Sequence, residues 1–145
     1  MITPFQNDFS IDYKALDVMI DYMINNGVEY IVSMGTTGEA PTISKEEKKN
    51  IVAHTLAKVA GRVPVVVGIG GNNTAETVHE LKTFPLDKAV AVLSVSPYYS
   101  KPSQEGLFQH YKAVAEASPR PVILYNVPGR TGRNLTAETT IRLAK

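Results

Sequence analysis

The sequence predicts an α/β fold in which five strand–helix units build a parallel sheet covered by helices. Two observations support this fold. Along the 145 residues, short apolar segments alternate with segments whose apolar residues recur at helical spacing. The short segments are apolar throughout, which is typical of strands buried on both faces of a parallel sheet. The expected strands are residues 1–4, 28–34, 63–67, 89–95 and 122–127.

The helices between these strands are predicted from residues that can cap their ends. Asp12 precedes the first helical segment and Asn26–Gly27 ends it. Ser44 and Glu47 have the spacing of a capping box, and Gly61 follows the end of that second helix. The three later helices are expected to begin at the polar residues Asn73, Ser103 and Thr136.

Composition and charge exclude several classes of protein. The content of 43% hydrophobic and 20% charged residues is ordinary for a globular domain, and no linker or second domain is visible. A net charge of +1 without a basic stripe argues against nucleic-acid binding. The chain has no apolar run of membrane-spanning length and no signal-peptide pattern, so we expect a cytoplasmic protein without a membrane partner. The absence of cysteine excludes disulfides, thiol catalysis and zinc–thiolate sites.

Two architectures fit five such units. The strand ends lie roughly 30 residues apart, which suits a (β/α)8 barrel, but a complete barrel typically needs about 250 residues. The chain is therefore either a piece of a barrel or a complete five-stranded, flavodoxin-like binding or signalling domain. The short first strand at residues 1–4, followed by a loop with one acidic residue at 5–8, disfavours the flavodoxin-like domain.

The segments that follow the strands differ in kind from those that follow the helices. They are rich in glycine, hydroxyl-bearing residues and tyrosine, whereas short connectors follow the helices. The carboxyl ends of parallel strands meet at one end of the sheet, where α/β proteins bind ligands. The sequence therefore predicts a ligand site built from residues 35–39, 68–73, 96–102 and 125–132.

Individual residues of these loops allow a structural interpretation as well as a functional one. Gly35–Gly38 could hold a carboxylate or phosphate through backbone N–H groups and threonine hydroxyls, or could be a simple turn. Arg130 could clamp a carboxylate or be a solvated charge. Adjacent Tyr98 and Tyr99 cannot both point inward, so one should face a site or a partner chain. The glycines at 68–71 lack the dinucleotide-binding pattern and indicate close backbone packing instead.

The three histidines are not expected to take part in chemistry. His54, His79 and His110 all fall within predicted helices, away from the loops and from one another. They assemble neither a metal site nor a Ser–His–Asp set. Catalysis at the predicted site would need proton transfer by tyrosine or threonine, or a lysine.

Three motifs resemble the dihydrodipicolinate synthase family, also called the 4-hydroxy-tetrahydrodipicolinate synthases. They are Gly35-Thr-Thr-Gly-Glu, the segment 96–107 with Ser-Pro-Tyr-Tyr and Pro-Ser-Gln-Glu-Gly-Leu, and Leu124-Tyr-Asn-Val-Pro-Gly-Arg-Thr-Gly. The likeness extends in order from residue 3 to residue 145. It implies a (β/α)8 TIM barrel, commonly a homotetramer formed as a dimer of dimers. Residues 1–145 would be a partial barrel of about five βα units, without strands six to eight and the C-terminal extension.

The resemblance also implies a reaction and a set of site residues. Members of the family are Schiff-base lyases that need no cofactor and use no metal. They condense pyruvate, bound to a barrel lysine, with L-aspartate 4-semialdehyde in the diaminopimelate route to lysine. By match, Thr36 and Thr37 hold the pyruvate carboxylate, and Arg130 receives the carboxylate of the aldehyde. Thr37, Tyr99 and Tyr125 form a proton relay, with Tyr99 supplied by the neighbouring subunit.

The chain departs from the family pattern at the nucleophile. The Schiff-base lysine of the family lies on the sixth strand, one unit beyond Tyr125, and no lysine of this chain is expected at a strand end. Lys101 lies in a loop without an apolar pocket to activate it. The chain as given is therefore expected to be inactive.

The sequence gives conflicting indications about feedback inhibition by lysine. Asn72, Glu76 and Tyr98 match positions of the family's regulatory lysine pocket. Lys45 and Lys48 stand where feedback-sensitive members often carry histidines.

Other functions remain alternatives. Sister enzymes such as N-acetylneuraminate lyase act on other 2-keto acids, but usually carry Gly-Ser-Thr-Gly-Glu at the first motif. An inactive barrel relative would be expected to have lost the relay residues, which are present at positions 37, 99 and 125.

Overall fold

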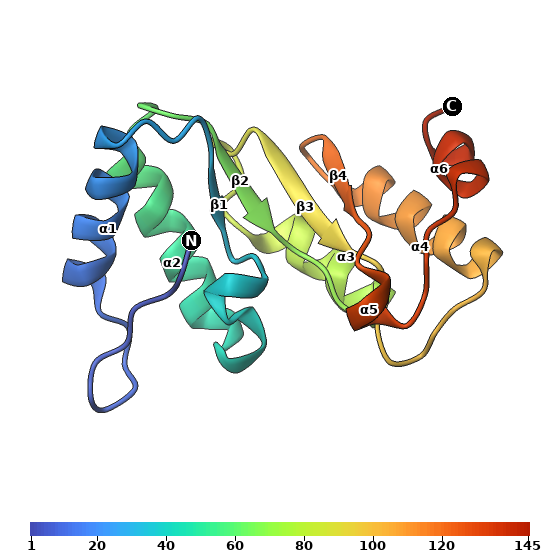
Figure 1. Cartoon of the computed structure of the whole chain (residues 1–145), viewed down its shortest axis with the longest axis horizontal. Coiled ribbons are helices and arrows are strands. Elements are labelled where there is room, and N and C mark those ends of the chain that lie inside the picture. Colours follow the sequence, from blue (N-terminus) through green and yellow to red (C-terminus); the bar gives the residue numbers. More distant parts are fainter. The chain divides into compact units, whose positions relative to one another are not determined.

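The structure, a computed structural model, describes all 145 residues and divides the chain into two compact units (Figure 1). The first unit comprises Met1–Gly68 and Phe84–Ala91, and the second comprises Ile69–Thr83 and Val92–Lys145. Both contain parallel strands and helices, so the predicted α/β class is confirmed. None of the helices is long and apolar enough to cross a membrane.

The first unit pairs two strands in parallel and places two helices side by side (Figure 1). In the strand pair, Ile31 lies opposite Val65 and Ser33 opposite Val67. Two short 3-10 turns connect the first strand to the second helix. The elements are α1 (Tyr13–Asn25), β1 (Ile31–Ser33), η1 (Thr36–Gly38), η2 (Ala40–Thr42), α2 (Lys45–Val59) and β2 (Val65–Gly68).

The predicted ends of these two helices are confirmed. The Asp12 carboxylate accepts the N–H of Ala15 at the start of α1, and Gly27 follows its end at a φ of 85°. At α2, the hydroxyl of Ser44 accepts the N–H of Glu47 while the Glu47 carboxylate accepts the N–H of Ser44. Such a cap typically stabilises a helix by about 1 kcal/mol.

The core of the first unit lies between the helices and the strand pair. Each fully buried aliphatic side chain contributes about 1.5–3 kcal/mol relative to its exposed state. The buried residues of this core include Leu16, Ile20, Ile31, Ile51, Val52, Leu56, Val59, Val65 and Val67.

The expectation of a strand at residues 1–4 is wrong, and the structure contains four strands rather than five. The segment still runs beside β1. The backbone nitrogen of Met1 donates to the carbonyl of Val32 at 2.8 Å, and the Thr3 hydroxyl donates to the carbonyl of Gly38 at 2.7 Å. Pro4 has no N–H with which to continue a ladder, so the pairing does not extend into a strand.

The second unit repeats the parallel strand pair and adds three helices of seven or more residues. Leu93 lies opposite Ile123 and Val95 opposite Tyr125. The predicted caps Asn73, Ser103 and Thr136 each accept backbone N–H groups at the start of a helix. The elements are α3 (Thr74–Thr83), β3 (Ala91–Val95), α4 (Gln104–Ala117), β4 (Val122–Tyr125), the short α5 (Pro128–Thr131) and α6 (Ala137–Leu143).

Helices cover only one face of the β3–β4 pair. Helix α4 contacts α3 and α6, and its Leu107 and Tyr111 form a buried cluster with Leu135, against which Leu124 packs. On the other face, the cross-strand pairs Leu93–Ile123 and Val95–Tyr125 are half-buried or exposed, and Ile123 is 44% exposed.

The predicted burial of strands on both faces is therefore only partly right. It holds for Val65–Val67 of β2, which are all buried. It is wrong for β4, which contains no buried residue. The physical reason is that β4 contacts a helical layer on one side only.

Candidate active site

The Thr36–Thr37 turn is the part of the predicted site that lies in the first unit. The chain leaves β1 through Met34, which has a left-handed φ of 58°, and enters the 3-10 turn at Gly35. The N–H of Gly38 closes the turn on the carbonyl of Gly35 at 2.9 Å. Thr36 and Thr37 are both exposed, and the first amides of such a turn have no acceptor within it. Hydroxyl and N–H donors are thus displayed together at a strand end.

Gly68, at the end of β2, fixes where this turn begins. A Cβ atom on Gly68 would lie 2.6 Å from the carbonyl carbon of Met34 and 3.1 Å from the nitrogen of Gly35. The first distance is shorter than real Cβ contacts and the second is tighter than most of them, and both involve backbone atoms, so only glycine fits here. The close backbone packing predicted for the glycines at 68–71 is therefore confirmed at Gly68.

Tyr125 ends β4 in the second unit and is held beside Ser96. The N–H of Ser96 donates to the Tyr125 carbonyl at 3.3 Å. The Ser96 hydroxyl lies 3.0 Å from the hydroxyl of Tyr111 in α4, which also donates to the Ser94 carbonyl at 3.2 Å. Ser94, Ser96 and Tyr111 are buried, whereas the Tyr125 side chain is half-buried.

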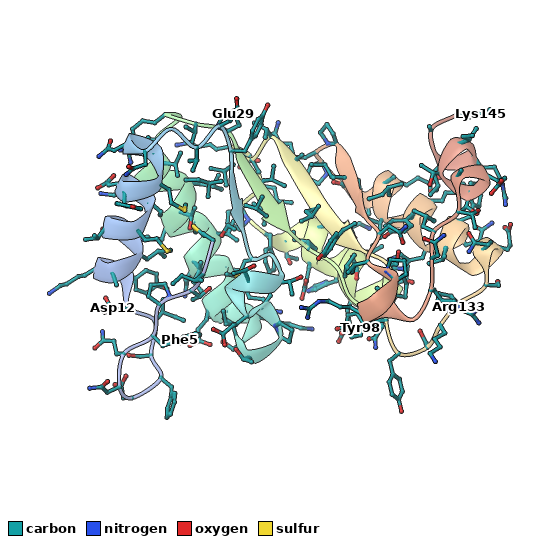
Figure 2. All side chains as sticks on the ribbon, viewed as in Figure 1. Phe5, Asp12, Glu29, Tyr98, Arg133 and Lys145 are labelled. Atoms are coloured by element: carbon teal, nitrogen blue, oxygen red, sulfur yellow. The ribbon has the colours of Figure 1, made fainter.

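Tyr98, labelled in Figure 2, and Tyr99 follow Ser96 in the chain, and both are exposed to solvent. Tyr98 is 40% exposed and Tyr99 is 90% exposed. The N–H of Ser100 donates to the Tyr98 carbonyl at 2.8 Å across Tyr99, whose φ is 70°. This is a strained γ-turn. The prediction that the two tyrosines cannot both point inward is confirmed, and Tyr99 is presented outward at the tip of the turn.

Arg130 lies on the short helix α5, and its side chain is exposed. Two residues that the sequence reasoning missed hold this segment. The Asn126 side chain accepts the N–H of Leu135 at 3.0 Å, and the buried Thr131 hydroxyl donates to the Arg133 carbonyl at 2.8 Å. Polar residues flanking a Pro-Gly turn were the available signal, because such residues commonly bond loop backbone.

The matched regulatory residues also lie in the second unit. Asn72 and Glu76 flank the start of α3, and Tyr98 follows β3. All three side chains are exposed. Lys45 and Lys48 lie in the first turn of α2, in the first unit.

The lysines and histidines lie where the sequence predicted. No lysine falls within a strand, and every lysine is exposed or half-buried. Lys101 is exposed, and its stem lies against Gly132. His54, His79 and His110 are in α2, α3 and α4, as predicted, and no group of His, Asp and Glu side chains could hold a metal ion.

His110 differs from the other two histidines because it is buried. Its Nδ1 lies 2.8 Å from the Thr74 hydroxyl, its ring meets Tyr111 edge-on, and its Nε2 has no partner. Burial lowers the pKa of His110. His110 thus joins α4 to the start of α3 as a packing residue.

Comparison with known proteins assigns the chain to a protein family. The model of the Dihydrodipicolinate synthetase family matches residues 1–145. A 4-hydroxy-tetrahydrodipicolinate synthase of Flavobacterium psychrophilum is 57% identical over 145 residues, covering 100% of this chain and 50% of the relative. The chain thus spans about half the length of the curated relatives it matches.

Solved structures agree. A dihydrodipicolinate synthase of Bacillus anthracis superposes with a TM-score of 0.96 at 45% identity, over 100% of this chain and 50% of that one. The enzyme of Acinetobacter baumannii, complexed with pyruvate, gives the same TM-score of 0.96, identity of 45% and coverage of 100% and 50%. The predicted (β/α)8 barrel class is confirmed, and the flavodoxin-like alternative is excluded. Over residues 1–145, the chain belongs to the dihydrodipicolinate synthetase family.

Proposed function

We propose that the whole protein to which these residues belong is a Schiff-base lyase, a 4-hydroxy-tetrahydrodipicolinate synthase that condenses pyruvate with L-aspartate 4-semialdehyde. One observation carries the proposal. A chain 57% identical to such a synthase carries the hydroxyls and the arginine of the three motifs, and places them at or shortly after the ends of strands. The reaction runs without a metal or cofactor, on the chemistry of an imine.

The Thr36–Thr37 turn binds the carboxylate of pyruvate. Its hydroxyls and free amides are neutral donors, so they pair with a carboxylate without adding a countercharge beside the reacting carbon. The close contact of Gly68 with Met34 supports this role because it fixes the start of the turn. The pyruvate complex of the Acinetobacter baumannii enzyme supports the choice of ligand class.

Thr37, Tyr125 and Tyr99 relay the protons of imine and enamine formation. Hydroxyl groups can accept and donate a proton in turn, and they do so without leaving a charge in a site closed to water. Tyr125 is held at the end of β4, whereas Tyr99 projects away from its own unit with 90% of its surface exposed. This exposure supports a Tyr99 that completes the site of a neighbouring subunit, in a homotetramer built as a dimer of dimers.

Arg130 binds the carboxylate of L-aspartate 4-semialdehyde. A guanidinium can hold a carboxylate through two parallel hydrogen bonds, which orients the aldehyde for attack. The anchors at Asn126 and Thr131 restrict the segment that carries it.

The nucleophilic lysine comes from outside residues 1–145. An amine that forms an imine needs a desolvated pocket that keeps it unprotonated, and every lysine here is exposed or half-buried. The remaining strands of the barrel also cover the open apolar face of β3 and β4, where Ile123 is 44% exposed. We place the complete enzyme in the cytoplasm.

Asn72, Glu76 and Tyr98 form part of a regulatory pocket for free lysine. An amide, a carboxylate and a phenol are suitable partners for an amino acid with two ammonium groups. Because Lys45 and Lys48 stand where feedback-sensitive members of the family often carry histidines, we expect inhibition by L-lysine to be weak.

The direct test is turnover by the purified full-length protein with pyruvate and L-aspartate 4-semialdehyde. Arg130→Ala should raise the KM of the aldehyde substrate, while Arg120→Ala, an arginine in the α4–β4 connector, should leave it unchanged. Absence of turnover with this pair, together with cleavage of a different 2-keto-acid aldol, would assign the protein to a sister lyase instead.

A further inference from the structure

We propose that Ser96 and Tyr111 are positioning residues that together hold Tyr99 and Tyr125 in register for the proton relay. The proposal rests on the proposed function. It concerns a buried pair of hydroxyl groups which lies behind the tyrosines and is itself remote from solvent.

The hydroxyl pair forms a directed network. The Tyr111 hydroxyl donates to the Ser94 carbonyl at 3.2 Å, so its single proton is used there. The Ser96 hydroxyl, 3.0 Å away, therefore donates to the Tyr111 oxygen. Ser94 and Ser96 are 0% exposed and Tyr111 is 1% exposed. Water cannot replace either bond, and loss of the Tyr111 hydroxyl leaves the Ser96 hydroxyl without its partner.

Ser96 connects this network to Tyr125. Its backbone N–H donates to the Tyr125 carbonyl at 3.3 Å, directly beyond the pairing of Val95 with Tyr125. The backbone before Ser96 is closely packed and has little room to move, because a Cβ on Gly70 would lie 2.8 Å from the nitrogen of Val95. A shift of Ser96 would therefore act on the carbonyl of Tyr125.

Ser96 also forms the base of the loop that presents Tyr99. Within the loop, a single local hydrogen bond from Ser100 to Tyr98 closes the γ-turn. At the far end of the loop, the Arg133 Nε donates a hydrogen bond to the Lys101 carbonyl at 2.9 Å, and this bond lies on the surface. Solvent competes with that exposed bond, so the buried Ser96–Tyr111 bond is the firmer of the two anchors.

The consequence for catalysis follows from the distances that proton relays require. Proton transfer needs heavy atoms within about 2.6–3.2 Å, so a small displacement of the loop reduces the rate. Pyruvate binding is assigned above to the hydroxyls and amides of the Thr36–Thr37 turn, and Ser96 is not one of those groups. Removal of the hydroxyl pair should therefore lower kcat and leave the KM of pyruvate near its original value.

The test uses the full-length protein with three single variants, one double variant and a matched control. Tyr111→Phe and Ser96→Ala each remove one hydroxyl, and Ser96→Thr keeps it. Ser118→Ala is the control, because the Ser118 hydroxyl donates to the Arg120 carbonyl at 2.6 Å at the opposite end of α4. We expect kcat to fall about three- to tenfold in Tyr111→Phe and Ser96→Ala, by the size of one hydrogen bond. The double variant should lose no more than about the larger single loss, and Ser96→Thr should recover activity.

Hydrogen–deuterium exchange of residues 94–100 supplies a readout that does not depend on activity. Exchange should be faster in Tyr111→Phe and Ser96→Ala and unchanged in Ser118→Ala. If the unmodified protein has no synthase activity, the proposed function fails, and exchange alone decides whether the pair anchors the loop. Unchanged exchange in Tyr111→Phe would overturn the inference. In an active enzyme, it would also be overturned by an unchanged kcat or by an equal loss of kcat in Ser118→Ala.

Discussion

Gly68 at the end of β2 lies in direct contact with the carbonyl group of Met34, the residue that leads from β1 into the Thr36–Thr37 turn. Met34 itself has a left-handed φ of 58°, so the bend is already strained. Two neighbouring strand ends thus touch through their backbones, and the turn that we propose binds pyruvate depends on a residue that carries no side chain.

Gly68→Ala should destabilise the protein. The added methyl group must push the Met34–Gly35 peptide away, and overpacking of this kind costs about 1–3 kcal/mol of unfolding free energy. Gly71→Ala is the control, because its Cβ would meet only the Thr77 hydroxyl at 3.7 Å. Urea unfolding of both variants measures the difference, and an equal effect at the two glycines would contradict the role of Gly68.

Thr37→Val should reduce turnover far more than stability. Valine keeps the β-branched shape but cannot pass a proton, and acid–base groups typically contribute about 10²–10⁴-fold to the rate. Thr42→Val provides the comparison, since it removes an exposed hydroxyl bonded to Glu39 in the next turn. Turnover with pyruvate and L-aspartate 4-semialdehyde is measured for both, and a Thr37→Val enzyme with nearly full activity would remove Thr37 from the relay.

Tyr99→Phe subunits should regain activity when mixed with subunits that lack the Schiff-base lysine. If Tyr99 acts across an interface, a mixed dimer holds one site with both lesions and one site with neither. Tyr22→Phe, at another exposed tyrosine, should keep full turnover and serves as the control. Mixed dimers that form but recover no activity would place Tyr99 in its own subunit.

Stability should decrease with falling pH through His110. Burial lowers the pKa of this residue below the value of about 6.5 that it has in the unfolded chain. Between these two pKa values the unfolded state binds more protons, so the stabilisation is complete above about pH 6.5 and is lost as the pH falls to the folded pKa. His110→Gln should abolish this pH-dependent contribution to the unfolding free energy.

The measurement compares the unfolding free energies of the unmodified protein and His110→Gln at about pH 7.5 and about pH 5.5. The difference in unfolding free energy between the unmodified protein and His110→Gln should be smaller at the lower pH. His79→Gln, on the exposed side of α3, should change little between the two. An advantage for His110 that is constant with pH would contradict a buried neutral imidazole.

Local features of the fold were predictable from sequence because their causes are local. Ser44 and Glu47 satisfy each other's backbone groups within one turn, and Asp12, Ser103 and Thr136 each accept one backbone N–H at another helix start. The expected strand at residues 1–4 failed because Pro4 lacks the N–H that a longer ladder needs, which outweighed the apolar pattern. The exposure of β4 was missed because apolar residues indicate a strand but not which faces are covered.

The candidate site also combines features that local sequence predicts with features that depend on distant contacts. Glycine, hydroxyl and tyrosine residues after the strands predicted where a ligand site should lie, and the proposed site is built from them. The residues that hold them in place were not visible: Asn126 reaches Leu135, and Ser96 reaches Tyr111 in a helix 15 positions away. These contacts depend on how helices lie against strands, which no short sequence pattern records.

Trapping of the pyruvate imine tests the central claim most directly. The full-length protein and residues 1–145 alone are incubated with pyruvate and borohydride, and the adduct is located by intact and peptide mass spectrometry. A synthase whose lysine lies outside this segment predicts one stoichiometric adduct on the full-length chain, on a lysine beyond residue 145, and none on residues 1–145. A stoichiometric adduct on Lys101 or another lysine of this segment, or no adduct on the full-length protein, would contradict it.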